Sequence, residues 1–167
     1  MKKLFLLAAF IIGATFYNQA EAQTISDNAL GLRFGGGDGV GAEISYQRAV
    51  GSNNNRLELD LGWRDNSDYD AFKLTGIYQW VWNIEGGFNW YAGAGAGLLG
   101  VDDTRFNDRD GDDGTYLFLA GNVGIEYDFD IPLLISLDVR PEFGFFSDND
   151  VLNEFSPDIA LGIRYQF

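Results

Sequence analysis

The sequence predicts an all-β fold, an eight-stranded antiparallel up-and-down transmembrane β-barrel. Three observations predict it. Apolar and polar residues alternate with a period of two through most of the chain after residue 25, as in strands whose two faces meet different surroundings. Eight segments alternate in this way. Their connections are mostly short turns and longer polar loops in alternation, which is typical of barrels that span a membrane.

The eight predicted strands differ in how clearly they alternate. In chain order they are 29–35, 40–48, 56–64, 70–81, 88–100, 115–127, 133–146 and 158–167. The second, third, seventh and eighth alternate most strictly, and we expect most strands to have about 9 to 12 residues, which suits a tilted membrane crossing. Short turns are expected at 51–55, 82–87 and 128–132. Loops rich in Asp and Asn are expected at 65–70, 102–114 and 147–154.

The first 22 residues have the three parts of a secretory signal peptide. Two lysines open the chain, an apolar stretch runs over 4–14, and a small-residue cleavage site of the A-x-A kind occupies 20–22. The apolar stretch is short for a bilayer-spanning helix, and a polar tripeptide follows it. We therefore expect a cleaved signal peptide at 1–22 and one barrel domain at 23–167.

Composition restricts the partners of the mature chain. It has no cysteine, so neither a disulfide framework nor a lipid-modified cysteine is available. Without the signal peptide, 9 basic and 24 acidic residues give a formal charge of −15. We expect such an acidic chain to bind no nucleic acid. It would meet acidic lipid phosphates only through bridging cations.

Alternation alone does not determine which face of the barrel is outside. A soluble lipocalin-like ligand-binding barrel would place Leu57, Leu59 and Leu61 inside. Two observations favour the inverse arrangement, with the apolar face towards lipid: the strand lengths match a membrane crossing, and aromatic residues gather near strand ends, as in interfacial girdles. These aromatic residues are Tyr46, Trp63, Phe72, Trp80, Trp90, Tyr127, Phe143, Phe145, Tyr165 and Phe167.

The polar face would then line an interior just wide enough for side chains. It carries six basic and seven acidic residues, which is close to neutral. Because buried charges are tolerated when paired, we expect an ion-pair network that plugs the lumen; a narrow ion path along the same charges is the alternative. The predicted network is Arg33, Glu43, Arg56, Glu58, Asp60, Arg64, Lys73, Glu126, Asp138, Arg140, Glu142, Asp158 and Arg164.

Two local expectations follow from the sequence of these strands. Glu58 and Asp60 are expected to form ion pairs with the arginines that flank them at 56 and 64. Pro141 lacks the N–H that a strand ladder needs, so we expect a bulge there or a position at the rim of the barrel.

The last strand alternates to the end of the chain and finishes on Phe167. This ending resembles the C-terminal assembly signal of Gram-negative outer-membrane proteins. The resemblance implies that the outer-membrane assembly machinery reads Ile163, Tyr165 and Phe167.

Over residues 25–167 the chain resembles the small eight-stranded barrels of the OmpX and OmpA-transmembrane-domain type. It fits most closely the outer membrane protein β-barrel domain families that are common in Bacteroidetes. The resemblance is architectural, and it implies a location in the outer membrane of a Gram-negative bacterium.

The acidic segment 102–114 is the one candidate for a metal site. Asp108, Asp110 and Asp112 occur at every second residue, and glycines at 111 and 114 allow sharp turns, as in the first half of a calcium-binding loop. The bidentate Glu of an EF-hand is absent, and strands flank the segment. The two interpretations are a specific Ca²⁺ site and a solvated loop that Ca²⁺ or Mg²⁺ bridges to lipopolysaccharide. We expect no other cofactor.

The sequence gives little support to an enzyme. Gly95, Gly97 and Gly100 match the spacing of a dinucleotide-binding motif, but no helix follows them, so we interpret them as part of a strand that packs closely on its neighbours. Enzymatic barrels of this size rely on a catalytic His, and the chain contains none. We therefore expect no catalytic residue.

Together these features predict an integral barrel with a structural or surface-interaction role. This role would be envelope integrity, contact with lipopolysaccharide, or adhesion through acidic outer loops. The expected partners are outer-membrane lipid, lipopolysaccharide and the assembly machinery, and we expect a monomer. The alternatives are a small ion-conducting channel and the soluble ligand-binding barrel.

Overall fold

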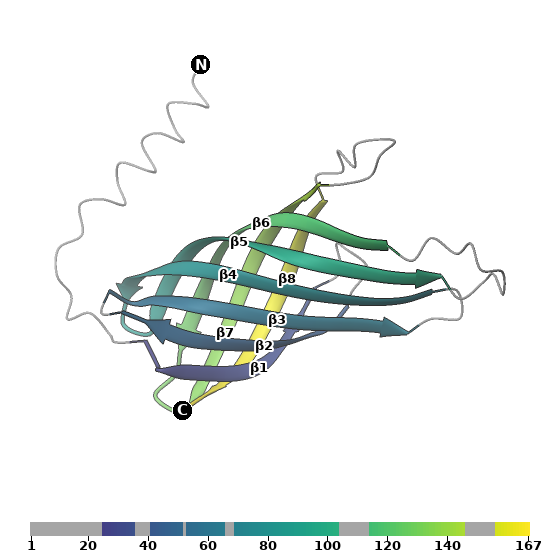
Figure 1. Ribbon diagram of the computed structural model, residues 1–167. Helices are drawn as coiled ribbons and strands as arrows, with labels where there is room; N and C mark the ends of the chain where they lie inside the picture. The colour runs from purple at the N-terminus through teal and green to yellow at the C-terminus, as the bar shows by residue number, and fades with distance from the viewer. Residues whose placement is uncertain (1–24, 36–40, 52, 66–68, 104–113, 146–155) are drawn as a thin grey trace, which may run out of the picture.

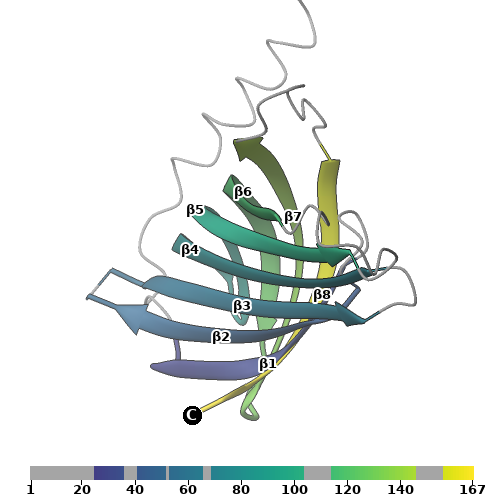
Figure 2. The ribbon, with the colours of Figure 1, turned by 45° about the vertical axis from the view of Figure 1, so that its right-hand side comes forward.

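The computed structural model describes residues 25–35, 41–51, 53–65, 69–103, 114–145 and 156–167. Its strands are β1 (Asn28–Phe34), β2 (Glu43–Val50), β3 (Asn55–Asp65), β4 (Tyr69–Glu85), β5 (Phe88–Asp103), β6 (Gly114–Asp128), β7 (Leu133–Phe145) and β8 (Ser156–Gln166). Each strand pairs antiparallel with the next, and β8 pairs with β1, so the sheet is a closed barrel (Figures 1 and 2). The predicted fold class is confirmed.

The three tight turns lie at one end of the barrel, which we call the turn end (Figure 1). Ile25 and Phe167 also lie at this end, because β1 starts there and β8 finishes there. The opposite end, where β1, β3, β5 and β7 finish, is called the loop end. In the described parts of the chain, no helix has the length and apolar character needed to cross a membrane.

The strands vary in length more than the sequence predicted. β1 has 7 residues, whereas β4 has 17 and β5 has 16. The expected turn at 82–87 is smaller, because Trp82 and Ile84 continue the outward positions of β4 and only Gly86 and Gly87 separate the strands. Gly86 has a φ of 52°, a region that favours glycine. The Asn83 amide supports this tight turn by donating to the carbonyl oxygen of Gly86 at 2.8 Å.

The two ends of the chain complete the barrel wall. The Phe167 N–H donates to the Asn28 carbonyl oxygen at 2.9 Å, and the Asn28 N–H donates to the Phe167 carbonyl oxygen at 3.1 Å. This pair of hydrogen bonds extends the seam between β8 and β1 to Phe167.

The strands are staggered as well as closed. Following paired residues once round the wall from Gln166 returns to β8 at Ser156, ten residues earlier. A stagger of this size tilts the strands by about 40° in an eight-stranded barrel. The intermediate partners are Ala29, Gln47, Glu58, Ile77, Gly95, Ala120 and Glu142. The stagger determines which side chains meet inside.

The outer face of the wall is apolar and the inner face is polar. Leu57, Leu59 and Leu61 are 38%, 42% and 44% exposed on the outside, whereas the residues between them are buried inside. This arrangement argues against the soluble ligand-binding barrel, which needs these leucines in its interior. It is the arrangement of a barrel whose outer wall faces lipid.

Pro141 lies in β7 towards the loop end. Its pairing with β6 is interrupted there, but the register is the same before and after the interruption, so no residue is inserted. The expected bulge is therefore absent from this part of β7, and Pro141 remains opposite Pro157 of β8. Gly121 of β6 leaves room for the ring, because a Cβ there would lie 3.2 Å from Pro141 Cγ.

Candidate functional site

The candidate site is the barrel interior, towards which every second residue of each strand points. Twelve of the thirteen residues of the predicted network have described side chains, and all twelve face inwards. Eleven of them are at most 3% exposed, and the side chain of Glu142 is 16% exposed. Arg64 belongs to β3, but its side chain lies outside what the structure describes.

Buried charge is distributed unequally round this interior. We call the inner face of β7, β8, β1, β2 and β3 the charged arc, and the inner face of β4, β5 and β6 the neutral arc. Among the side chains that the structure describes, the neutral arc contributes two buried charged residues, Lys73 and Glu126. The charged arc contributes Arg33, Glu43, Arg56, Glu58, Asp60, Asp138, Arg140, Asp158 and Arg164.

Arg33 of β1 connects three other strands. Its guanidinium donates to Asp138 of β7 at 2.7 Å, to Asp158 of β8 at 2.7 Å and to Glu43 of β2 at 2.9 Å. All three carboxylates are buried with it. Because charge-assisted hydrogen bonds are the strong ones, this one side chain holds a large part of the wall together.

Arg140 and Arg164 cross the lumen to β3. Arg140 donates from Nη2 to Glu58 at 2.9 Å and to Asp60 at 2.5 Å, and from Nη1 to Glu43 at 3.4 Å. Arg164 donates to the other oxygen of Glu58 at 3.1 Å. It also donates to the hydroxyl groups of Ser45 at 2.9 Å and Ser136 at 2.8 Å.

The expected pairing of Glu58 with its neighbour Arg56 is wrong. Arg56 instead forms a bidentate pair with Glu126 of β6, at 2.6 and 3.1 Å. Residues two apart in a strand project side by side, whereas a long side chain can reach across a narrow lumen. Asp60 likewise pairs with Arg140.

Neutral amides connect these ion pairs across the neutral arc. Arg56 donates to Gln79 at 2.6 Å, Gln79 to Asn122 at 2.8 Å, and Asn122 to Asp138 at 3.2 Å. The hydrogen bonds therefore run without a break from the Arg56 pair to the Arg33 cluster. Nearer the loop end, Lys73 pairs with Glu142 at 2.6 Å.

Glycine and aromatic residues fill the rest of the neutral arc. A Cβ on Gly95 would overlap the backbone of Gly76, and one on Gly97 would overlap the ring of Phe118. A Cβ on Gly124 would lie 2.5 Å from the Tyr91 ring. The close packing expected of the glycines in β5 is thus present. Two cations lie over these rings, Arg56 at 4.9 Å from the Tyr91 centroid and Lys73 at 5.2 Å from that of Phe118.

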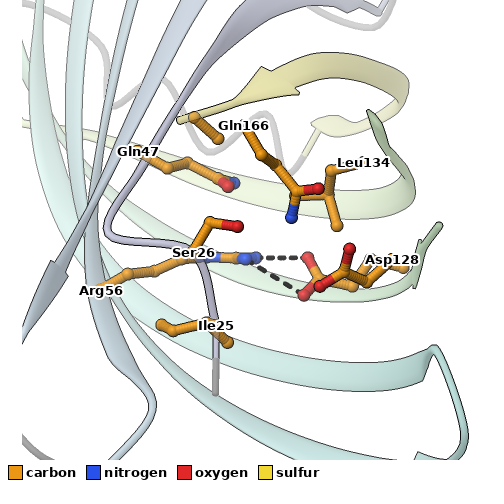
Figure 3. A pocket seen from close by; sticks show the side chains of 9 residues that line it. Ile25, Ser26, Gln47, Arg56, Asp128, Leu134 and Gln166 are labelled. Carbon is orange, nitrogen blue, oxygen red and sulfur yellow. Dashed lines mark hydrogen bonds and ion pairs between the residues drawn. The ribbon is translucent and has the colours of Figure 1, made fainter. Parts of the chain in front are cut away.

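The segment that precedes β1 covers the turn end of the lumen (Figure 3). Ile25 is buried there against Val81 and Tyr91, and the Ala49 N–H donates to the Asp27 carbonyl oxygen at 2.9 Å, which anchors the segment. The cavity behind Ile25 has a volume of about 10 Å³, and Arg56 is among its lining residues. This volume admits one water molecule at most. Sequence reasoning missed Ile25, although it is the only apolar residue between the expected cleavage site and β1.

The outer wall carries aromatic pairs towards both ends. Trp63 and Phe72 are cross-strand partners towards the loop end. At the turn end, Trp82 stacks on Trp90 at 4.4 Å between centroids. Further aromatic residues of the turn end are Phe88, Tyr127, Phe129, Tyr165 and Phe167. Trp and Tyr at these levels suit the two interfaces of a membrane.

Two predicted sites remain predictions. Ile163, Tyr165 and Phe167 all point outwards from β8, and their recognition by the assembly machinery is a matter for experiment. Asp108, Asp110 and Asp112 lie outside the described residues. Within the described ranges, no group of three or more His, Cys, Asp or Glu is arranged to hold a metal ion.

A closed eight-stranded wall, apolar outside and packed with charged groups inside, defines a small membrane barrel. No protein-family model matches the chain, and no curated protein matches it significantly. Solved structures do match. One is the N-terminal β-barrel domain of Pseudomonas aeruginosa OprF, with a TM-score of 0.65 and 13% identity over 85% of this chain and 98% of that domain.

Neisserial surface protein A (NspA) also matches, with a TM-score of 0.54 and 16% identity over 85% of this chain and 94% of that one. The chain thus has the fold of the small eight-stranded outer-membrane barrels, as the sequence predicted.

Proposed function

We propose that this protein is an integral barrel of a Gram-negative outer membrane, with a structural or surface-interaction role and a closed interior. The observation that carries the proposal is the inverted wall. Exposed leucines and aromatic residues cover its outside, and buried ion pairs tie its strands together inside. The apolar surface would be covered by lipid, and residues 1–22 would direct export.

A closed interior is supported at several levels of the lumen. Arg33, Arg140 and Arg164 bridge the charged arc near its middle. Phe118 and Tyr91 fill space on the neutral arc, and Ile25 covers the turn end. A barrel of this kind contributes to the envelope through its surfaces. The acidic segment 102–114, bridged by Ca²⁺ or Mg²⁺ to lipopolysaccharide, is the contact that we propose. No catalytic step is proposed.

One observation favours the channel as a second candidate. Hydrogen-bonded polar groups run without a break from Asn83 at the turn end, through Glu126 and Asn122, to Arg33. Rearrangement of these groups would open a polar route past Ile25.

Conductance of the refolded mature chain in a planar bilayer tests the closed interior. We expect insertion without discrete conductance steps, because ion pairs and rings occupy the lumen. Insertion is verified in parallel by protection of the barrel from protease. Reproducible steps from the wild-type chain would overturn the closed interior and favour the channel. An Ile25→Ser variant then determines whether this residue limits the current. Recovery of the native protein in buffer without detergent would overturn the membrane location.

Removal of Phe167 tests the assembly signal. We expect the deletion to lower the amount of folded, surface-exposed barrel while secretion to the periplasm continues. The deletion removes both an aromatic side chain and a rung of the seam, so Phe167→Ala is the matched variant, because it keeps the backbone pairing. Equal loss in both variants would indicate recognition of the side chain. Unchanged surface levels in both would contradict a role for this residue in assembly.

A further inference from the structure

Buried polar atoms that lack a hydrogen-bond partner gather at one place in the interior. Among the described residues they are Glu43 Oε1, Asp60 Oδ1, Thr75 Oγ1 and Arg140 Nε. Arg140 binds the other oxygens of both Glu43 and Asp60. Thr75 of β4 is the direct cross-strand partner of Asp60, and side chains of such partners lie within about 5 Å of each other. All four residues are at most 2% exposed.

The same place has too little positive charge. Arg33, Arg140 and Arg164 face five buried carboxylates. Arg56 and Lys73 have carboxylate partners of their own in Glu126 and Glu142. By sequence, the predicted network has six positive and seven negative residues, and the described side chains include five of the six positive ones. An uncompensated buried carboxylate is strongly unfavourable, so one further positive charge is needed.

We propose that Glu43, Asp60 and Thr75 form a binding site for one small monovalent cation, either a metal ion of the Na⁺ type or a hydrated proton. Carboxylate and hydroxyl oxygens are the ligands that hard cations prefer. A single positive charge matches the deficit of the network. Arg140 Nε–H would donate to a water molecule that accompanies the cation. The site has two carboxylates, and the described residues contain no larger acidic group that would suit a divalent ion.

Charged groups from several strands surround this site. Together with Asp60 they include five carboxylates and three guanidinium groups, whereas the Lys73 ammonium is paired with Glu142. This excess of carboxylates favours a cation. These charged groups are Glu58 on β3, Glu43 on β2, Lys73 on β4, Asp138 and Arg140 on β7, Asp158 and Arg164 on β8, and Arg33 on β1.

The test measures the urea concentration at which half of the lipid-embedded mature barrel is unfolded. The measurement is made in Na⁺ and again with Na⁺ exchanged for N-methylglucamine at constant ionic strength. Both series are repeated at several pH values. A midpoint that rises with Na⁺ identifies a metal ion as the source of the charge. A midpoint that does not depend on Na⁺ but falls as pH rises identifies a proton as the source of the charge. In that case the folded state binds more protons than the unfolded state. A midpoint that responds to neither overturns the proposal.

Asp60→Asn links either response to the site. This variant removes the surplus negative charge at nearly constant shape, so we expect the response to disappear and the barrel to remain folded without Na⁺. Thr75→Val keeps every charge and removes only the hydroxyl, so we expect a weaker response; it carries the test if Asp60→Asn fails to fold. Glu85→Gln, at the exposed end of β4, is the control and should respond as the wild type does. An unchanged response in both Asp60→Asn and Thr75→Val would overturn the site.

Discussion

Arginine side chains on the charged arc cross the lumen to reach carboxylates on distant strands, whereas glycines on the neutral arc make room for rings from neighbouring strands. Arg140 of β7 reaches Glu58 and Asp60 of β3. In contrast, Gly97 of β5 lies against Phe118 of the adjacent β6. The first solution depends on directional, charge-assisted bonds, and the second on close packing.

The difference shows how a barrel without a conventional apolar core is stabilised. Ion pairs join strands that face one another across the lumen, but a buried charge is strongly destabilising if its partner is removed. Rings and glycines fill the remaining volume without that risk. The two arcs meet where Tyr91 lies against Arg56 and donates to Asp138 at 3.4 Å.

The largest effect is expected from the charged arc. Arg140→Ala leaves Glu43, Glu58 and Asp60 without one of their donors, and we expect a loss of about 3–5 kcal/mol in the free energy of unfolding. Urea unfolding in lipid vesicles measures it. Arg48→Ala, on the exposed part of β2, is the matched control, with little change expected. A small loss for Arg140→Ala would mean that water hydrates the ion pairs of the charged arc. The contrast between the two arcs would then be wrong.

A smaller effect is expected from the neutral arc. In Gly95→Ala the new methyl group would overlap the backbone of Gly76 and Ile77, and we expect a loss of about 1–3 kcal/mol from overpacking. Gly144→Ala is the matched variant, because a Cβ there meets nothing within 4 Å. The same unfolding measurement distinguishes them. Equal stability of the two variants would show that the neutral arc is loosely packed.

The smallest effect is expected where the arcs meet. Tyr91→Phe keeps the ring beneath Arg56 and removes the hydroxyl that binds Asp138, so we expect a loss of about 0.5–1 kcal/mol. A double-mutant cycle with Asp138→Asn measures the coupling between the two residues. Additive effects would indicate that the arcs are energetically independent.

The sequence was sufficient to predict the two faces of the wall but not the partners inside it. Alternation assigns Glu58 and Asp60 to the interior because side chains change face at every residue. Their partner Arg140 lies on β7, far from β3 in the sequence. It lies at the same height in the lumen as Glu58 and Asp60 only because the strands are staggered. Pairing by proximity in sequence therefore failed for Arg56, which meets Glu126.

The lengths of the strands were also beyond the sequence signal. The predicted turn at 82–87 includes Trp82, Asn83 and Ile84, which belong to β4 in the structure. The Asn83 side-chain amide donates hydrogen bonds to the carbonyl oxygens of Gly86 and Phe88, which allows β4 to continue as far as the glycine turn. The role of Ile25 was not predicted, because one isolated apolar residue forms no alternating pattern.

The seam between Asn28 and Phe167 has a consequence for the timing of biogenesis. β1 pairs on one side with β2, its neighbour in sequence, but on the other side with β8, the last of the eight strands. Pairing of strands that are neighbours in sequence therefore cannot close the wall, and closure has to wait until β8 lies beside β1. Until then β1 and β8 each present an unpaired strand edge, which favours pairing with other chains.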